Sequence, residues 1–168
     1  MNRHHYSIVE IGQARLDPAA ALDFVSDPGF GGLAMFAGKV RDLNQGRVVL
    51  GVGYDLFDAL ALNSFREILR EVDAEFGPRL KLYVAHAKGR LSVGDIAVVV
   101  AAGSPHRDEA FRACRGVIEA VKHRSPIWKQ EHYEDGDSAW SEGCSLCGHG
   151  EDSVAAGGAS AHSHGSAP

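Results

Sequence analysis

The segment Ile96-Ala97-Val98-Val99-Val100-Ala101-Ala102-Gly103-Ser104-Pro105 decides the fold that this sequence predicts. Its first seven residues are all apolar and favour β structure, so they predict a buried, central strand. Ser104 then predicts a helix N-cap, with Pro105 at the first helical position. The apolar stripe of that helix is expected to consist of Phe111, Cys114, Ile118 and Val121. A central strand thus leads directly into a helix that covers the sheet.

Segments on both sides of this unit alternate between strand and helix patterns. Asp17-Pro18 predicts the start of a helix that ends near Val25, and Asp58 predicts the cap of a helix over 59–76, stopped by Gly77-Pro78. Residues 39–47 are polar and predict a loop, and 88–95 predict turns. Strands are expected at 7–11, 32–37, 48–57, 80–86 and 127–133. This order favours an α+β fold, a mixed sandwich.

The composition changes near the C-terminus. Gly, Ala, Ser and His dominate from Gly148 onward, and few large apolar residues remain to offset the entropy of ordering. We expect a domain over 1–143 and a tail over 144–168, disordered from about residue 148.

Charge and hydropathy exclude several classes of protein. The net charge is −5, but residues 132–168 hold six acidic residues and no Lys or Arg, which leaves 17 basic and 16 acidic residues before them. Such a balance gives no footprint for nucleic acid. The sequence has no apolar run long enough to span a membrane and no signal-peptide pattern, so we expect a cytosolic protein. Three cysteines argue against a disulfide framework.

Two lysines, Lys122 and Lys129, flank a Ser125-Pro126 break between the last helix and the last strand. Held close together, their ammonium groups could bind an anion, and each would depress the other's pKa. A lysine of that kind can act as a nucleophile or proton donor. The alternative is that both are solvated lysines at a helix end, where the helix dipole favours them.

Three further residues are candidates for binding an anion. His106 and Arg107 lie at the start of the last helix, where free backbone N–H groups favour a negative charge. Alternatively, Arg107 pairs with Asp108 or Glu109. Arg41 follows a strand and could bind a ligand or be a solvated surface residue.

Cys144 and Cys147 form a single C-x-x-C pair, with His149, His162 and His164 nearby. One such pair lacks the second pair of ligands that a zinc site needs, so we expect no metal site and keep metal binding as an alternative. We expect Ile127 and Trp128 to be packing residues and His86 to be a structural histidine. The common nucleotide-binding and hydrolase motifs are absent.

Four segments in this order resemble the catalytic (large) subunit of molybdopterin synthase, over about residues 6–140. They are Phe36-Ala-Gly-Lys-Val-Arg-Asp-Leu-Asn-Gln-Gly46, Gly89-Arg-Leu-Ser-Val-Gly-Asp95, Ser104-Pro-His-Arg-Asp-Glu-Ala-Phe111 and Lys122-His-Arg-Ser-Pro-Ile-Trp-Lys-Gln-Glu131. The last segment is highly specific to the family.

The resemblance implies a sulfurtransferase of molybdenum cofactor biosynthesis. Such subunits add two sulfurs to cyclic pyranopterin monophosphate (precursor Z) and form the dithiolene of molybdopterin. The sulfur arrives as a thiocarboxylate on the C-terminal Gly-Gly of a separate, small ubiquitin-like subunit. The family assembles as a heterotetramer around a large-subunit homodimer, has an α/β hammerhead fold with an added antiparallel sheet, and needs no metal or organic cofactor for this step.

The resemblance also implies roles for the candidate residues. Lys122 and Lys129 would be catalytic, whereas Arg41, His106 and Arg107 would bind the substrate, the last two entering the pocket from the partner subunit. This sequence departs from the family pattern at residues 54–61 and at Ala87, where the family has Arg. A non-catalytic paralogue that binds a ubiquitin-like partner, or a metal through its Cys/His tail, is the competing hypothesis.

Overall fold

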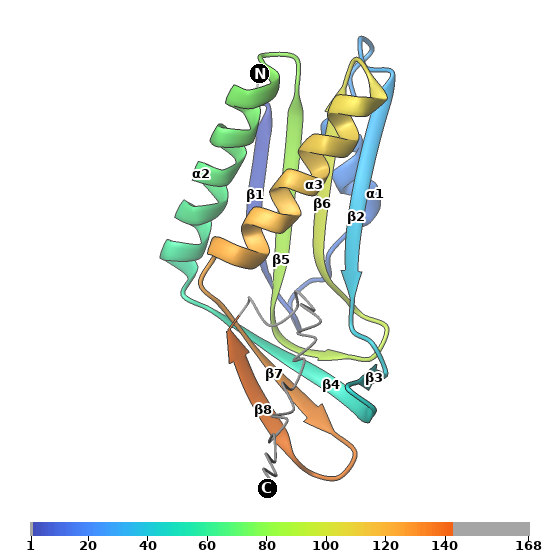
Figure 1. Ribbon diagram of the computed structural model, residues 1–168, viewed down its shortest axis with the longest axis vertical. Helices are drawn as coiled ribbons and strands as arrows, with labels where there is room; N and C mark the ends of the chain where they lie inside the picture. The colour runs from blue at the N-terminus through green and yellow to red at the C-terminus, as the bar shows by residue number, and fades with distance from the viewer. Residues whose placement is uncertain (1, 143–168) are drawn as a thin grey trace, which may run out of the picture.

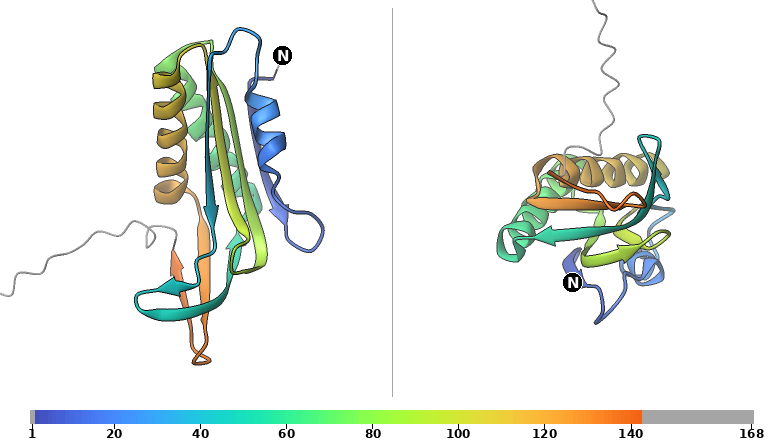
Figure 2. Two further views of the ribbon diagram at one scale, coloured as in Figure 1. Left: turned by 90° about the vertical axis from the view of Figure 1, so that its right-hand side faces the viewer. Right: turned by 90° about the horizontal axis from the view of Figure 1, so that it is seen from below.

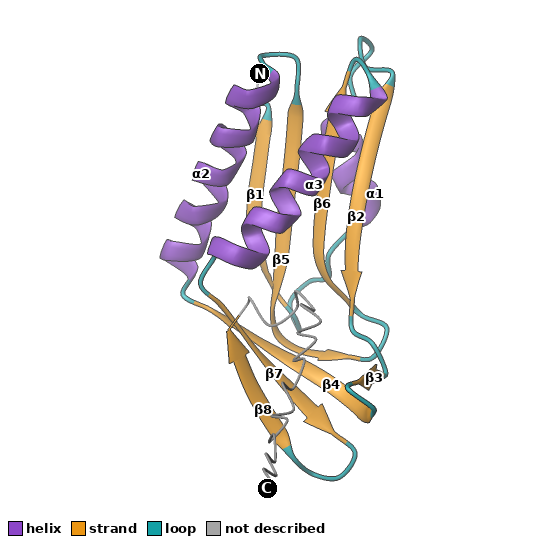
Figure 3. Ribbon diagram, in the orientation of Figure 1, coloured by secondary structure: helices purple, strands orange, loops and turns teal. Residues whose placement is uncertain are grey.

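The computed structural model describes residues 2–142, and they form three helices and eight strands (Figures 1 and 3). In chain order they are β1 His4–Glu10, α1 Pro18–Val25, β2 Gly32–Lys39, β3 Leu43–Asn44, β4 Arg47–Leu56, α2 Asp58–Phe76, β5 Lys81–Ser92, β6 Ile96–Ser104, α3 Arg107–Arg124, β7 Ile127–Tyr133 and β8 Ser138–Glu142.

Strand β5 belongs to two sheets, because its two halves pair with different neighbours. Its first part pairs with β6 and with β1, and the upper sheet has the order β2-β6-β5-β1. Its last residues, Gly89–Ser92, pair with β4, which continues through β7 to β8 in the lower sheet. Gly89, with φ of +108°, lies where the pairing changes, in a conformation that favours glycine. The two sheets therefore meet along one continuous strand (Figure 1).

Helices cover both faces of the upper sheet. Figure 2 shows α2 and α3 side by side on one face and α1 on the other. Strand β6 lies between β2 and β5, and its residues from Ala97 onward are buried, which confirms the predicted central strand. A Cβ atom built on Gly103 would lie 1.9 Å from the carbonyl oxygen of Val25, so only glycine lets α1 pack this closely on β6.

The predicted mixed α+β class is confirmed, but several local predictions are wrong. Residues 88–91 continue β5 and do not form a turn, because Lys88 pairs with β1 and the residues from Gly89 onward pair with β4. The third helix begins at Arg107, with His106 as its N-cap, and Ser104 ends β6. Asp58 lies inside the first turn of α2 and does not cap it; the N-cap is Phe57. The predicted cap at Asp17 is confirmed, since its carboxylate accepts a hydrogen bond from the Ala19 amide.

Two strands were not predicted. Strand β3 pairs with the start of β4 through a two-residue loop, Gln45-Gly46, in which both residues have positive φ. Strand β8 pairs with β7 across its whole length. The predicted tail over 144–168, with its candidate metal ligands, lies outside the described residues.

Candidate functional site

A cavity of about 520 Å³ lies between the C-terminal end of α3, the end of β2 and the lower sheet. Its volume falls within the range of small-molecule sites in proteins. Residues from β2, the segment after it, β3, β4, β6, α3 and β7 line it. The polar members of this lining are Lys39, Arg41, Asn44, Tyr54, Lys122, Lys129 and Glu131.

Lys122 and Lys129 line the same cavity although different elements carry them. Lys122 lies in the last turn of α3, which ends at Arg124. Pro126 follows the C-cap, and Lys129 is the third residue of β7, with its side chain turned to the buried face of the sheet. The break at Ser125-Pro126 thus redirects the chain so that both ammonium groups can reach one ligand.

Glu131 is a site residue whose role could not be predicted from the residues around it. Its Oε1 lies 2.6 Å from Nζ of Lys129, and each side chain is only 10% exposed. Burial disfavours the charged form of Glu131, but hydrogen bonds from Lys129, Tyr133 and Asn44 outweigh it and lower the pKa of the carboxyl below its ordinary value. Lys129 is therefore paired with a carboxylate in the cavity that Lys122 also lines. The spacing of alternate residues on β7 could have indicated this pairing.

Tyr54 lines the cavity, and the fully buried His86 lies against its ring. Their rings are 5.0 Å apart in an edge-on arrangement. Burial, assisted by the positive charge of Lys122, lowers the pKa of His86 to about 3, so its ring is neutral. Its Nδ1 donates to the carbonyl oxygen of Ala87 at 2.8 Å. Burial and the charge of Glu131 raise the pKa of Tyr54 to about 12. The interpretation of His86 as a hydrogen-bonded structural histidine agrees with these contacts.

Arg41 also lines the cavity, from the exposed segment that follows β2. His106 and Arg107 do not line it. They lie at the start of α3, whereas Lys122 lies near its other end, about 22 Å away at 1.5 Å of rise per residue. Both are exposed, and among residues 2–142 the neighbouring Asp108 and Glu109 bind other groups, Arg112 and Ser104.

Two neighbouring residues have different environments from each other. Ile127 is buried, as predicted for a packing residue, but Trp128 is 38% exposed, which contradicts its predicted role in packing. The alternation of β7 turns Trp128 to the outer face, away from Lys129.

Cys114, the one cysteine within the described range, is buried in the core as expected, and burial raises the pKa of its thiol to about 11. It is no nucleophile near neutral pH.

Within residues 2–142, no cluster of three His, Cys, Asp or Glu side chains could hold a metal ion. Across the same range, no helix is both long and apolar enough to cross a bilayer.

Comparisons with known proteins agree with this geometry. The family described as MoaE protein matches residues 11–124. The molybdopterin synthase catalytic subunit of Synechococcus elongatus is 47% identical over 139 residues, which are 83% of this chain and 84% of that protein.

Solved structures support the same assignment. Molybdopterin synthase from Staphylococcus aureus superposes with a TM-score of 0.74 and 29% identity, over 84% of this chain and 98% of that one. A structure described as a protein–protein complex of subunits 1 and 2 of molybdopterin-converting factor from Helicobacter pylori shares the fold, with a TM-score of 0.66 and 21% identity over 81% and 89% of the two chains. The predicted resemblance is confirmed: the chain belongs to the MoaE protein family, whose members include catalytic subunits of molybdopterin synthase.

Proposed function

We propose that this chain is the catalytic subunit of a molybdopterin synthase, which transfers sulfur from a thiocarboxylated small subunit to cyclic pyranopterin monophosphate. The observation that supports this most strongly is the convergence of Lys122, Lys129 and Arg41 on one cavity. A phosphorylated substrate and a thiocarboxylate are both anions, and a partly enclosed site with four cationic side chains, these three and Lys39, suits them.

The two lysines share the catalytic roles in this proposal, and Arg41 binds the substrate. Lys129 and Lys122 polarise the thiocarboxylate, stabilise the negative charge that develops as its sulfur attacks the pterin side chain, and move protons. Arg41 holds the phosphate. Cys114 is buried with a raised thiol pKa, so among the described residues no cysteine supplies the sulfur. A separate protein that ends in Gly-Gly fits the need for a donor, and the Helicobacter pylori complex offers a parallel for such a two-subunit assembly.

A homodimer along β2 would complete the site with His106 and Arg107. β2 is an edge strand whose Leu33, Met35 and Phe36 are between 39% and 44% exposed. Exposed apolar side chains in a row along an edge favour association with a second copy.

One end of β2 lies beside His106 and Arg107, and its other end lies beside the cavity. Gly32, at its start, packs so closely on the start of α3 that a Cβ atom would lie 2.8 Å from Cα of Arg107. The residues at its end, from Phe36 to Lys39, line the cavity. β2 spans about 23 Å, which matches the distance along α3. An antiparallel alignment of two β2 edges therefore brings one chain's His106 and Arg107 to the partner's cavity, and two small subunits would make a heterotetramer.

The competing function is a non-catalytic paralogue that binds a ubiquitin-like partner, or a metal through the Cys/His tail. The presence of both Lys122 and Lys129 in the cavity disfavours it. The cytosolic location expected from the sequence stays a prediction.

Conversion of precursor Z by a mixture of this chain and a thiocarboxylated small subunit tests the proposal. Lys122→Ala should abolish nearly all dithiolene formation and leave thermal unfolding unchanged, because a lysine at a helix end contributes little stability. Lys81→Ala is the matched control, since Lys81 binds Ser26 and Asp27 at the opposite end of β5 and should keep full activity. Full activity of Lys122→Ala would refute the catalytic role.

A further inference from the structure

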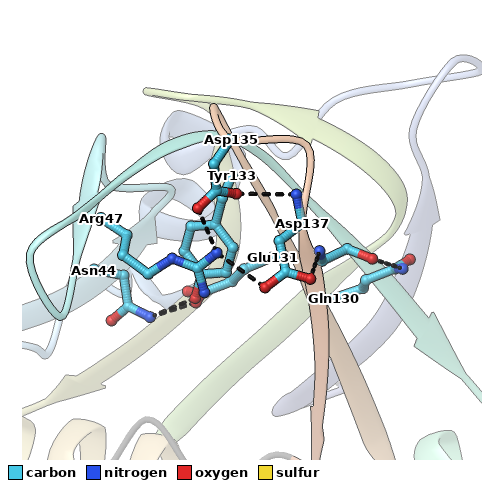
Figure 4. Close-up of polar contacts among 8 residues, drawn as sticks. Asn44, Arg47, Gln130, Glu131, Tyr133, Asp135 and Asp137 are labelled. Carbon is cyan, nitrogen blue, oxygen red and sulfur yellow. Dashed lines mark hydrogen bonds and ion pairs between the residues drawn. The ribbon is translucent and has the colours of Figure 1, made fainter.

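The two carboxylate oxygens of Glu131 bind different partners. Oε1 pairs with Lys129, as described above, whereas Oε2 accepts hydrogen bonds from the Tyr133 hydroxyl at 2.6 Å and from the amide of Asn44 (Figure 4). The Asn44 amide also lies 3.1 Å from the Tyr133 oxygen. Because two donors occupy Oε2, the carboxylate cannot rotate without losing both hydrogen bonds.

The ring of Tyr133 is itself held in place. Cζ of Arg47 lies 3.7 Å from the ring centroid, and the same guanidinium donates to Asp135 at 2.7 Å and Asp137 at 3.0 Å, in the turn between β7 and β8 (Figure 4). A guanidinium stacked on an aromatic face is attracted to it. Arg47 thus links the β3–β4 hairpin to the β7–β8 turn.

The hairpin presents Asn44 and Arg47 together. They are directly opposed partners on either side of the Gln45-Gly46 loop, so their side chains emerge on the same face. One contacts the hydroxyl of Tyr133 and the other its ring. Only Asn44 of the two lines the cavity.

We propose that Tyr133 and Asn44, with Arg47 stacked behind them, are positioning residues that fix Glu131 and thereby aim the Lys129 ammonium into the cavity. Neither Tyr133 nor Arg47 lines the cavity, so both act on the substrate only through Glu131 and Lys129. This inference rests on the proposed function for its effect on turnover, but not for its effect on Lys129 itself. The hydrogen bond to Glu131 also raises the pKa of Tyr133, so the phenol stays protonated and remains a donor.

Tyr133→Phe tests the proposal, because it keeps the ring beneath Arg47 and removes only the hydroxyl. Tyr83→Phe is the matched control: Tyr83 is also buried, but it stacks on His5 and lies against Phe24 of α1. We expect turnover to fall on the order of tenfold in Tyr133→Phe with an unchanged KM for the small subunit, and no change in Tyr83→Phe. Asn44→Ala should behave like Tyr133→Phe.

The pH profile gives a readout that a purely structural role would not change. The charged and titratable groups around Glu131 are Lys129 and Tyr133 of β7, Tyr54 of β4, Lys122 of α3, Lys39 at the end of β2, and Arg41 in the segment after it. A hydrogen bond from Tyr133 lowers the pKa of Glu131, so its loss should move the acid limb of the kcat profile to higher pH.

Acetylation of lysine amines by acetic anhydride, followed by mass spectrometry, reports on Lys129 without any turnover. We expect Lys129 to be acetylated several-fold faster in Tyr133→Phe than in the wild type, with Lys81 as an unchanged internal reference. Equal acetylation together with wild-type turnover and pH profile would overturn the inference. Faster acetylation in a chain that shows no sulfur transfer even as wild type would uphold it and refute the proposed function.

Discussion

Nζ of Lys129 lies 2.6 Å from Oε1 of Glu131, two residues further along the same strand. The alternation of a strand places such a pair on one face, and here that face lines the cavity. A buried ion pair is costly to break, since removal of one partner leaves the other charge without compensation. The pair therefore fixes a charged group at the position where an anionic substrate is expected to bind.

Glu131→Gln should remove this compensation while preserving the size of the side chain. We expect the free energy of unfolding in urea to fall by roughly 2 kcal/mol and sulfur transfer to fall more than about 100-fold. Glu119→Gln is the control, since Glu119 forms an exposed pair with Arg115 on α3 and should cost less than about 0.5 kcal/mol. Equal stability and activity in the two variants would show that the buried pair has no special role.

Local sequence patterns correctly predicted those strands and helices whose position depends mainly on their own residues. The apolar run after Ile96 became the central strand, and Asp17-Pro18 became a capped helix start. The predicted turn at 88–91 was wrong because Gly89, with its positive φ, does not end β5. The composition of this segment is typical of a turn, but its pairing with β4 stabilises it as a strand. Hairpin β3–β4 was missed because Gln45 adopts a positive φ that its side chain does not favour.

The site was predictable only in part for a related reason. Pro126 indicated that Lys122 and Lys129 flank a change of direction, and both line one cavity. Nothing in the local sequence connects Asn44 to Glu131, because 87 positions separate them and the contact exists only through the pairing of β4 with β7. The expected placement of His106 and Arg107 depends on a second chain, so it stays a prediction.

Truncation after Gly143 tests the predicted domain boundary. The residues that line the cavity all precede this position, so we expect unchanged turnover and an unchanged melting temperature. A zinc titration of the full and truncated chains by calorimetry tests the alternative that the tail binds a metal. Only the full chain carries Cys144 and Cys147, so zinc binding by the full chain alone would support that alternative. A large loss of turnover on truncation would contradict the boundary.

His86 should make the fold sensitive to acid. Its pKa is about 3 in the folded chain and near the ordinary 6.5 when unfolded, so the unfolded state binds more protons as the pH falls below 6.5. The stability that the neutral His86 contributes is thus fully present above pH 6.5 and is lost as the pH falls towards 3. Between pH 7 and pH 5 the expected loss from this one residue is about 2 kcal/mol.

Urea unfolding of His86→Gln at these two pH values measures the contribution of His86. The glutamine amide can still donate to the Ala87 carbonyl but does not titrate, so the decrease in stability should be about 2 kcal/mol smaller than in the wild type. An unchanged dependence in His86→Gln would show that another group controls the acid response.

Complementation between two inactive chains tests whether His106 and Arg107 act across the homodimer. One chain carries Lys122→Ala, and the other carries His106→Ala and Arg107→Ala, each with a different affinity tag. If the residues act in trans, a heterodimer purified through both tags has one site with both substitutions and one site with none. It should regain about half of the wild-type activity. If they act within one chain, both sites of the heterodimer stay damaged and the activity of the mixture remains at the level of the separate variants. That second outcome would refute the antiparallel alignment along β2. Substitution of Leu33 and Met35, which are exposed on β2, should give a monomeric control.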